Sequence, residues 1–346
     1  MGRTLTLTSL SAALFVALAA NPLPAAAQAP QHSWLVPELQ QQAKAEGALT
    51  VYGSMNEGEA LPLWKLFEDE SGIKVSYVRG SDTQIMARAA IEERARQRSW
   101  DIALTTIVSQ MPPAFLAPFD PPQAARLMPQ ARDSDRRWYG VYANYNAPAY
   151  NTKFVQKADL PKTYEDFAAH KEWRGKVAID GTDKEWLAAL FAANGEERGR
   201  ALVKNIVDTL DPIIADGHLA LARSVGSGEY GVALNNFLPL TLNVKMSGAP
   251  TDYWLLSPVT LIFGSVGVNV LAPHPNAARL AANFVLSAEG QTFMTHKGRI
   301  PTRPDVATNP PELAGQLAQM EIAPIVLDAA GQRKWQKTFN ELFHRS

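Results

Sequence analysis

The chain has 346 residues, more than one ordinary domain needs, and this length indicates about two domains. A hydrophobic fraction of 46% with 19% charged residues supports a large buried core and argues against disorder. The 33 basic residues balance 34 acidic ones, which argues against a nucleic-acid-binding face and against a protein held to membranes by charge. With 0 cysteines, the sequence excludes disulfides, thiolate metal sites, iron–sulfur clusters and cysteine nucleophiles.

Residues 1–27 are predicted to be a cleavable signal peptide. Arg3 precedes an apolar run over residues 5–20, and three alanines at residues 25–27 supply the small side chains that a signal peptidase reads. The run is shorter than the roughly 20 residues that span a bilayer. We expect cleavage before Gln28. No cysteine is available for lipid attachment, so we expect the exported mature chain to be free and soluble.

The mature chain opens with strands alternating with amphipathic helices, a pattern that predicts an α/β sheet with right-handed crossovers. The expected strands are residues 49–52, 73–78 and 101–104. The expected helices are residues 59–70 and a second one that follows residues 81–83 and runs to about residue 96. Gly72 is suited to end the first helix, and residues 81–83 can cap the second. The side chains expected on the inner face of the first helix are Leu61, Trp64, Leu66 and Phe67.

A second α/β unit is predicted from residue 139 to about residue 256, after a proline-rich, turn-rich stretch. Its expected helices are residues 164–170, 185–193, 197–207 and 218–224. The apolar, β-branched run at residues 257–271 is long enough to pass from one unit to the other. Further helices are expected at residues 277–286, 289–296 and 324–343.

Sequence motifs for chemistry fail on their context. Residues 226–231 satisfy GxGxxG, but a helix precedes them and a strand follows, the reverse of a dinucleotide site. They predict a helix end and a turn. Ser71 to Lys74 matches SxxK without its partner motifs. The histidines lack the spacing of metal ligands and are expected on the surface or in the core: His32, His170, His218, His274, His296 and His344. No catalytic centre is predicted.

Four stretches resemble a known family, in its order and spacing, and span essentially the whole mature chain. They are residues 49–81, 173–180, 222–236 and 274–306. The last is the most specific, from the helix start at His274-Pro275-Asn276 to the closing residues 301–304, PTRP. The chain thus resembles periplasmic solute-binding proteins of ABC transporters, extracellular solute-binding family 1, in the ferric-ion-binding-like branch.

The resemblance implies the type II periplasmic binding protein fold, with two α/β lobes joined by crossing hinge strands and a ligand between them. Lobe 1 is expected to comprise residues 28–141 plus 262–309, and lobe 2 residues 142–261 plus 310–346. The implied function is solute capture by hinge closure, with delivery to an inner-membrane ABC permease. We expect a monomer that is not an enzyme and has no cofactor. A sensor that reports to a membrane receptor, and a periplasmic enzyme on the same fold, are the rival classes.

Ferric-binding relatives hold iron with an acid or histidine in the first loop, a glutamate after the third strand and a consecutive tyrosine pair. The corresponding positions here carry Asn56 or Glu57, then the neutral pair Thr105 and Thr106, then Phe237-Leu238. Neither Phe237 nor Leu238 can bind a metal, so no metal ligands are predicted. Ferric iron or an iron chelate remains the alternative solute.

The main prediction is a small organic anion or zwitterion, such as a phosphonate, phosphate ester or carboxylate. Hydroxyl groups and free N–H groups at helix starts favour an anionic group. For residues 81–83, capping of the following helix is as well supported as contact with the ligand. Asp180, Asp183 and Glu57 are solvated loop acids on one reading and partners of an amine or of sugar hydroxyls on the other. Lys184 is expected to be exposed more often than bound, and Trp186 and Trp254 are expected in the core. The predicted ligand-binding residues are Ser54, Asn56, Glu57, Ser81, Thr83, Thr105, Thr106, Tyr145, Asp180, Thr182, Asp183, Lys184, Asn236 and Phe237.

Overall fold

A computed structural model describes residues 1–2, 32–323 and 325–343. The predicted signal peptide lies outside the described residues, apart from Met1 and Gly2. Contacts group Ser33–Ser346 into one unit, which contains both of the sheets. No helix in the described ranges has the length and apolarity needed to cross a membrane.

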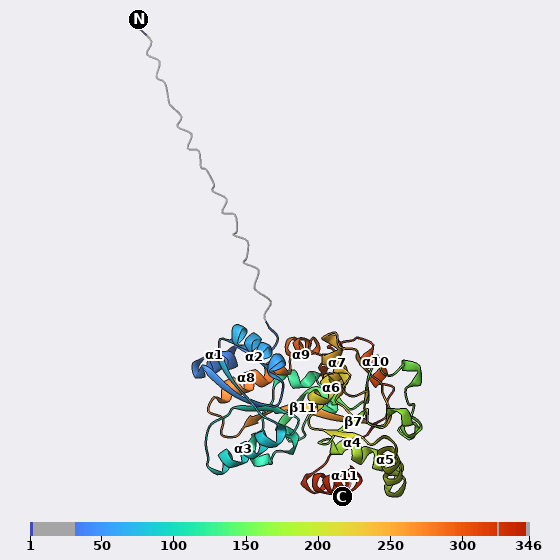
Figure 1. Ribbon diagram of the computed structural model, residues 1–346. Coiled ribbons are helices and arrows are strands. Elements are labelled where there is room, and N and C mark those ends of the chain that lie inside the picture. Colours follow the sequence, from blue (N-terminus) through green and yellow to red (C-terminus); the bar gives the residue numbers. More distant parts are fainter. Residues whose placement is uncertain (3–31, 324, 344–346) are drawn as a thin grey trace. The chain divides into compact units, whose positions relative to one another are not determined.

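The first sheet has eight strands in the order β12-β5-β11-β3-β1-β2, with β4 and β13 also paired to β11. Figure 1 labels β11, the strand shared by these pairings. β1 is parallel to β2 and β3, whereas β11 is antiparallel to β3 and β5. The strands are β1 Ala48–Gly53, β2 Lys74–Arg79, β3 Ile102–Thr105, β4 Leu116–Ala117, β5 Trp138–Tyr145, β11 Val259–Asn269, β12 Ile300–Pro301 and β13 Ile322–Ala323. The helices that accompany this sheet in the chain are α1 Pro37–Glu46, α2 Glu57–Ser71, α3 Asp82–Arg94, α8 Pro275–Val285 and α9 Ala288–Thr295. The predicted strand–helix–strand pattern of this part is confirmed.

The second sheet has five strands in the order β10-β6-β9-β7-β8. They are β6 Ala149–Asn151, β7 Val177–Asp180, β8 Ile213–Ala215, β9 Val232–Ala233 and β10 Thr251–Tyr253. The remaining helices are α4 Lys184–Asn194, α5 Glu196–Leu210, α6 His218–Ser227, α7 Leu238–Met246, α10 Leu313–Leu317 and α11 Ala329–Phe343. Trp335 and Phe339 of α11 join the core of this unit together with Trp186 of α4, and the last helix packs against α4 and α5.

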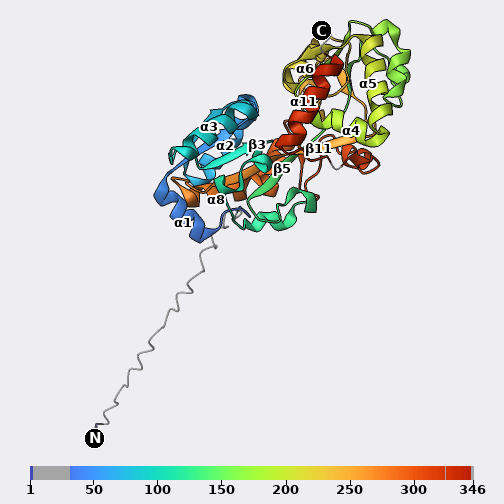
Figure 2. The same cartoon turned by 90° about the horizontal axis from the view of Figure 1, so that it is seen from below.

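Two long strands carry the chain between the sheets. β5 leaves the first sheet and is followed by β6 of the second, and β10 is followed by β11, which returns to the first. β5 and β11 pair with each other in antiparallel fashion from Leu261 opposite Tyr145 to Gly267 opposite Trp138, and they lie side by side in Figure 2. These are the crossing strands that the sequence indicates. The residue boundaries of the two lobes stay a prediction.

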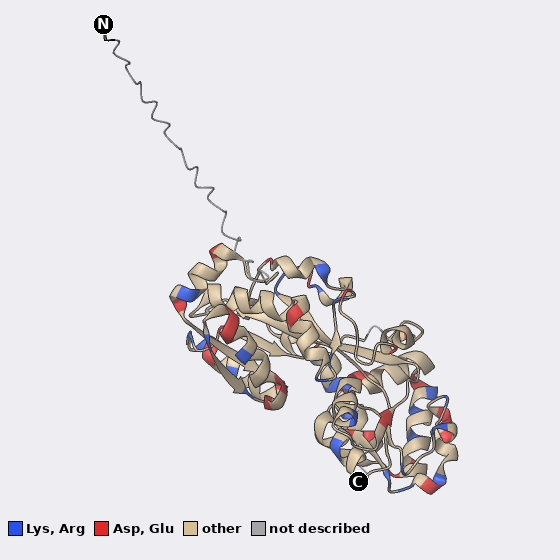
Figure 3. Cartoon of the chain, turned by 90° about the horizontal axis from the view of Figure 1, so that it is seen from above, with Lys and Arg blue, Asp and Glu red and all other residues tan. Residues whose placement is uncertain are grey.

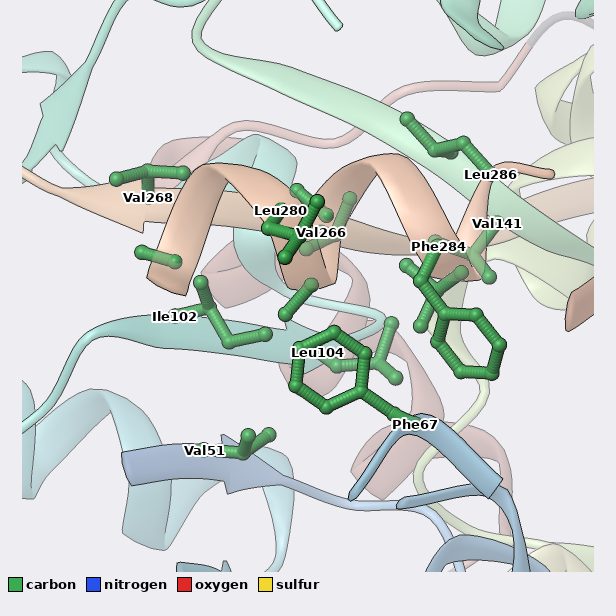
Figure 4. Close-up of a cluster of buried hydrophobic side chains, with 14 of the residues drawn as sticks. Val51, Phe67, Ile102, Leu104, Val141, Val266, Val268, Leu280, Phe284 and Leu286 are labelled. Atoms are coloured by element: carbon green, nitrogen blue, oxygen red, sulfur yellow. The ribbon is translucent and has the colours of Figure 1, made fainter. Parts of the chain in front are cut away.

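The core of the first sheet forms where apolar faces of α2 and α8 meet the strands (Figure 4). Phe67 of α2 and Phe284 of α8 pack with ring centroids 5.5 Å apart. The predicted inner face of α2 is partly wrong, because Leu61 is 51% exposed while Leu63 is fully buried. The buried side chains of the helix follow the spacing Glu59, Ala60, Leu63, Trp64, Phe67 and Ser71.

Of two further local predictions, one is confirmed and one is wrong. The GxGxxG stretch is a helix end, as predicted, because α6 stops at Ser227 and Gly228 takes a φ of 85°. Residues 164–170 do not form an α-helix but a 3-10 segment, Glu165–Ala169. Its start is fixed by Asp166, whose carboxylate accepts the backbone N–H groups of Lys162 and Thr163. Basic and acidic residues are interspersed along the ribbon (Figure 3).

Candidate functional site

At the end of β3 in the first sheet, the hydroxyls that the sequence predicts to be free are bound to a carboxylate. Asp82, the first residue of α3, accepts a hydrogen bond from the Thr105 hydroxyl at 2.7 Å, and its other oxygen accepts the Thr106 hydroxyl. Ser81 forms a capping box with Gln84, in which its Oγ accepts the Gln84 N–H. The Thr105 and Thr106 hydroxyls, which were predicted to bind an anion, therefore donate to a carboxylate of the chain itself, and Asp82 places a negative charge beside them.

Asp180 ends β7 of the second sheet and is 0% exposed. Its Oδ1 accepts the Thr182 backbone N–H at 2.7 Å and the Thr182 hydroxyl. Its Oδ2 is buried and has no hydrogen-bond partner among the described residues. The alternative of a solvated loop acid is wrong for Asp180, and a buried carboxylate oxygen without a partner is costly unless something else binds it.

His218, the first residue of α6, lies beside this carboxylate. Asn236 donates through Nδ2 to the Thr241 hydroxyl, so its Oδ1 is an acceptor, and His218 Nδ1 lies 3.1 Å from that oxygen. We therefore assign the ring proton to Nδ1, which leaves a lone pair on Nε2. Nε2 is 3.9 Å from Asp180 Oδ1, too far for a hydrogen bond.

The surroundings keep His218 neutral. Burial lowers the pKa of His218, although the negative charges of Asp180 and Asp82 oppose this. The ring stacks on Phe237 with centroids 3.7 Å apart. The sequence prediction missed this histidine, because it stands alone in the chain. Its position at a helix start of the second unit is the one signal that could have found it.

Asp183 and Lys184 are buried at the start of α4 and bind groups of the chain itself. Asp183 is 3% exposed, so the solvated-acid alternative is wrong for it too. It caps α4 by accepting the Trp186 N–H and also accepts Asn146 Nδ2, and burial raises its pKa well above the ordinary value. Lys184 is 4% exposed, against the prediction, because its ammonium donates to the Gly181 carbonyl and lies over the Phe339 ring of α11.

The remaining predicted residues fall into two groups. Asn56 accepts a hydrogen bond from Arg79 at 3.3 Å, while Glu57 and Thr83 are exposed, Thr182 is exposed and Ser54 is half-buried. Thr106 and Tyr145 instead line a separate cavity of about 750 Å³. Burial raises the pKa of Tyr145. Asp180, Asn236 and Phe237 are the predicted residues that the fold gathers around His218.

A buried ion pair close to β5 also escaped the sequence prediction. Arg299 Nε donates to Glu59 Oε2 at 2.7 Å, and the guanidinium lies 4.5 Å above the centroid of the Tyr142 ring. Burial raises the pKa of Tyr142 to about 12, so this phenol keeps its proton. Arg299 also reaches Asn144 Oδ1 at 3.4 Å. The arrangement holds α2 and the segment before β12 against a crossing strand.

Asp180 and His218 supply two groups suited to a cation, and the described part of the chain contains no cluster of three or more His, Asp or Glu side chains placed to hold a metal ion. A metal there would need further ligands from another molecule. Phe237, which stacks on His218, has no atom that can act as a metal ligand.

The structure resembles solved binding proteins that share its fold. Iron-bound HitA from Pseudomonas aeruginosa aligns with a TM-score of 0.71 at 21% identity, over 84% of this chain and 99% of that one. AfuA from Actinobacillus pleuropneumoniae, with exogenous fructose-6-phosphate bound, aligns with a TM-score of 0.72 at 19% identity, over 87% and 99%. The type II periplasmic binding protein fold is confirmed.

Two curated relatives have iron in their names. One is an Fe(3+)-binding periplasmic protein of Serratia marcescens, 27% identical over 267 residues, 73% of this chain and 78% of the relative. The other is iron uptake protein A1 of Synechocystis, 26% identical over 267 residues, 71% and 73% of the two chains. A family model described as bacterial extracellular solute-binding protein matches residues 114–320. The chain is therefore a member of the bacterial extracellular solute-binding proteins, a non-enzymatic family of transport components.

Proposed function

We propose that the chain is the periplasmic solute-binding component of an ABC importer and that its solute is ferric iron carried by a chelating molecule. The family supports solute capture, and the names of the two relatives support iron. Export through the predicted signal peptide brings the chain to the periplasm, and an inner-membrane permease receives the solute. In this proposal β5 and β11 act as the hinge, and the lobe boundaries remain those expected from the sequence.

The observation that carries the proposal is the geometry of His218 and Asp180. A neutral imidazole presents the lone pair of Nε2 toward a carboxylate whose Oδ2 is buried and, among the described residues, unpartnered. Metal-binding histidines commonly donate their other ring N–H to an oxygen acceptor, as His218 does to Asn236. Imidazole and carboxylate together suit iron.

Charge separates this proposal from the main sequence prediction. Asp82 and Asp180 both act on His218, which is itself neutral, so the local field attracts a cation and opposes a free anion. Thr105 and Thr106 donate to Asp82 and are not free to bind a phosphate or carboxylate. The organic anion is therefore less well supported than the iron alternative. A chelator supplies the oxygen ligands that relatives obtain from the tyrosine pair.

Iron retention by the mature chain tests the proposal. Protein beginning at Gln28 is mixed with ferric citrate, citrate alone, fructose 6-phosphate or an aminophosphonate, and bound iron is measured after gel filtration alongside thermal unfolding. A ligand at about 1,000 times its Kd adds roughly 4 kcal/mol of stability, so true binding is visible as a rise in Tm. Of these four additions, we expect only ferric citrate to give both retained iron and a rise in Tm.

Variants assign the site. His218→Ala and Asp180→Asn are expected to lower iron retention at least tenfold, while the exposed His296→Ala serves as the matched control. Stabilisation by a phosphate ester without iron retention would reject the proposal in favour of the organic anion. Equal iron retention by His218→Ala and His296→Ala would show that iron binds elsewhere.

A further inference from the structure

A second cavity lies beside the crossing strands, and its lining contains none of Asp82, Asp180 and His218. It measures about 750 Å³, within the range of small-molecule sites, and is bounded by β11, β12 and residues from 314–323 and 325–327. Its walls are largely apolar, with Trp138, Tyr145 and Phe263 as the aromatic side chains. Val326 in its lining is 90% exposed, so the cavity is reached from solvent.

Two charged side chains occur in this lining, Glu185 and Arg303. Arg303 is neutralised by Asp305 through two hydrogen bonds, of 2.9 and 2.7 Å. Glu185 is 8% exposed, and the side chain that donates to it among the described residues is neutral, Gln332 through Nε2 at 2.7 Å. Burial raises the pKa of Glu185, although the nearby charge of Lys184 opposes this. The described lining thus contains one buried carboxylate that lacks a direct ion-pair partner.

We propose that this cavity is a second binding site, for a small organic cation that has an ammonium group on a flat apolar body. The ammonium pairs with Glu185, and the apolar body packs against Trp138, Tyr145 and Phe263. Aromatic faces attract cations as well as apolar groups, so the lining favours an amine over a neutral ring. This site is independent of the proposed iron function.

Calorimetry with two matched probes tests the proposal on the mature chain. Tryptamine and indole-3-propionate share one ring system and carry opposite charges. We expect tryptamine to bind at least tenfold more tightly at pH 7.5, with the difference shrinking as Glu185 is protonated at lower pH. Glu185→Gln should remove the preference, whereas Glu197→Gln, at an exposed position outside the cavity, should keep it.

A second variant and a competition experiment complete the test. Ala318 is exposed and lines the cavity, so Ala318→Trp fills it from the rim with little risk to folding and should abolish binding of tryptamine. Iron retention of the same variants should equal that of the parent. Equal binding of both probes, no binding of tryptamine, or loss of tryptamine binding on addition of ferric citrate or in Asp180→Asn would overturn the proposal.

Discussion

Removing the charge of Arg299 should destabilise the protein strongly. Arg299 and Glu59 have side chains that are 7% and 6% exposed and are joined at 2.7 Å. In Arg299→Met the apolar volume is roughly kept, but the Glu59 carboxylate stays buried without its cation. Such a broken buried pair costs about 3–5 kcal/mol, far more than an exposed pair contributes.

The same contact network sets the size of the effect. The variant also loses the cation–π contact with Tyr142 and the hydrogen bond to Asn144 Oδ1. We expect a loss of about 4 kcal/mol in total, which at roughly 2 °C per kcal/mol for a long chain lowers Tm by about 8 °C. Replacing both partners, Glu59→Leu with Arg299→Met, should recover most of this loss because no lone charge remains.

Urea and thermal unfolding of the parent, both single variants and the double variant measure this double-mutant cycle. Arg303→Met is not a suitable control, because Arg303 is also buried and paired. The exposed pair of Lys65 and Asp69 is suitable, and Lys65→Met should cost under about 1 kcal/mol. A loss under about 1 kcal/mol in Arg299→Met, or a double variant as unstable as the sum of the single ones, would refute the reasoning.

Three further predictions concern the cap of α3, the crossing strands and His218. Ser81→Ala removes the capping box and should cost about 1 kcal/mol in urea unfolding while leaving iron retention unchanged; a tenfold loss of iron would instead place Ser81 in the site. Gly264→Ala places a Cβ 2.1 Å from the Tyr142 ring and should lower the free energy of unfolding by about 3 kcal/mol or more. Gly315→Ala, whose Cβ would have nothing within 4 Å, should cost little, and equal losses in the two variants would contradict the packing argument. Burial lowers the pKa of His218, so as the pH falls the imidazole is protonated in the unfolded chain before it is protonated in the folded one. The free energy of unfolding relative to His218→Gln should therefore be constant at pH 7.5 to 8.5 and fall as the pH drops below about 6.5. A pH-independent difference between the two proteins would contradict the burial of a neutral imidazole.

Local chemistry explains why much of the fold was predictable. The strands of the first sheet and the helices after them follow hydrophobic periodicity, and Gly72 and Gly228 end their helices with φ values of 78° and 85°. The order of motifs along the chain indicated the family, which the comparison with the family model confirms. The residue types at positions 237 and 238, Phe and Leu, are enough by themselves to exclude a tyrosine pair there.

Periodicity was weaker where packing decides which face is buried. Leu61 and Leu63 both fit an apolar stripe on α2, and only the position of the sheet selects Leu63. The burial of Lys184 depends in the same way on α11, which follows it by well over a hundred residues and provides Phe339. A single-sequence pattern contains no information about that contact.

The residue types of the site were determined by the sequence, and their partners were decided by the tertiary structure. Thr105 and Thr106 had the hydroxyls that an anion needs, but the fold turns both toward Asp82. His218 has no metal-ligand spacing in the chain, yet the end of β7 and the start of α6 bring it to Asp180. The physical reason is that the charge and hydrogen-bonding capacity of a side chain are local properties, whereas its burial and its partners depend on how distant strands and helices pack.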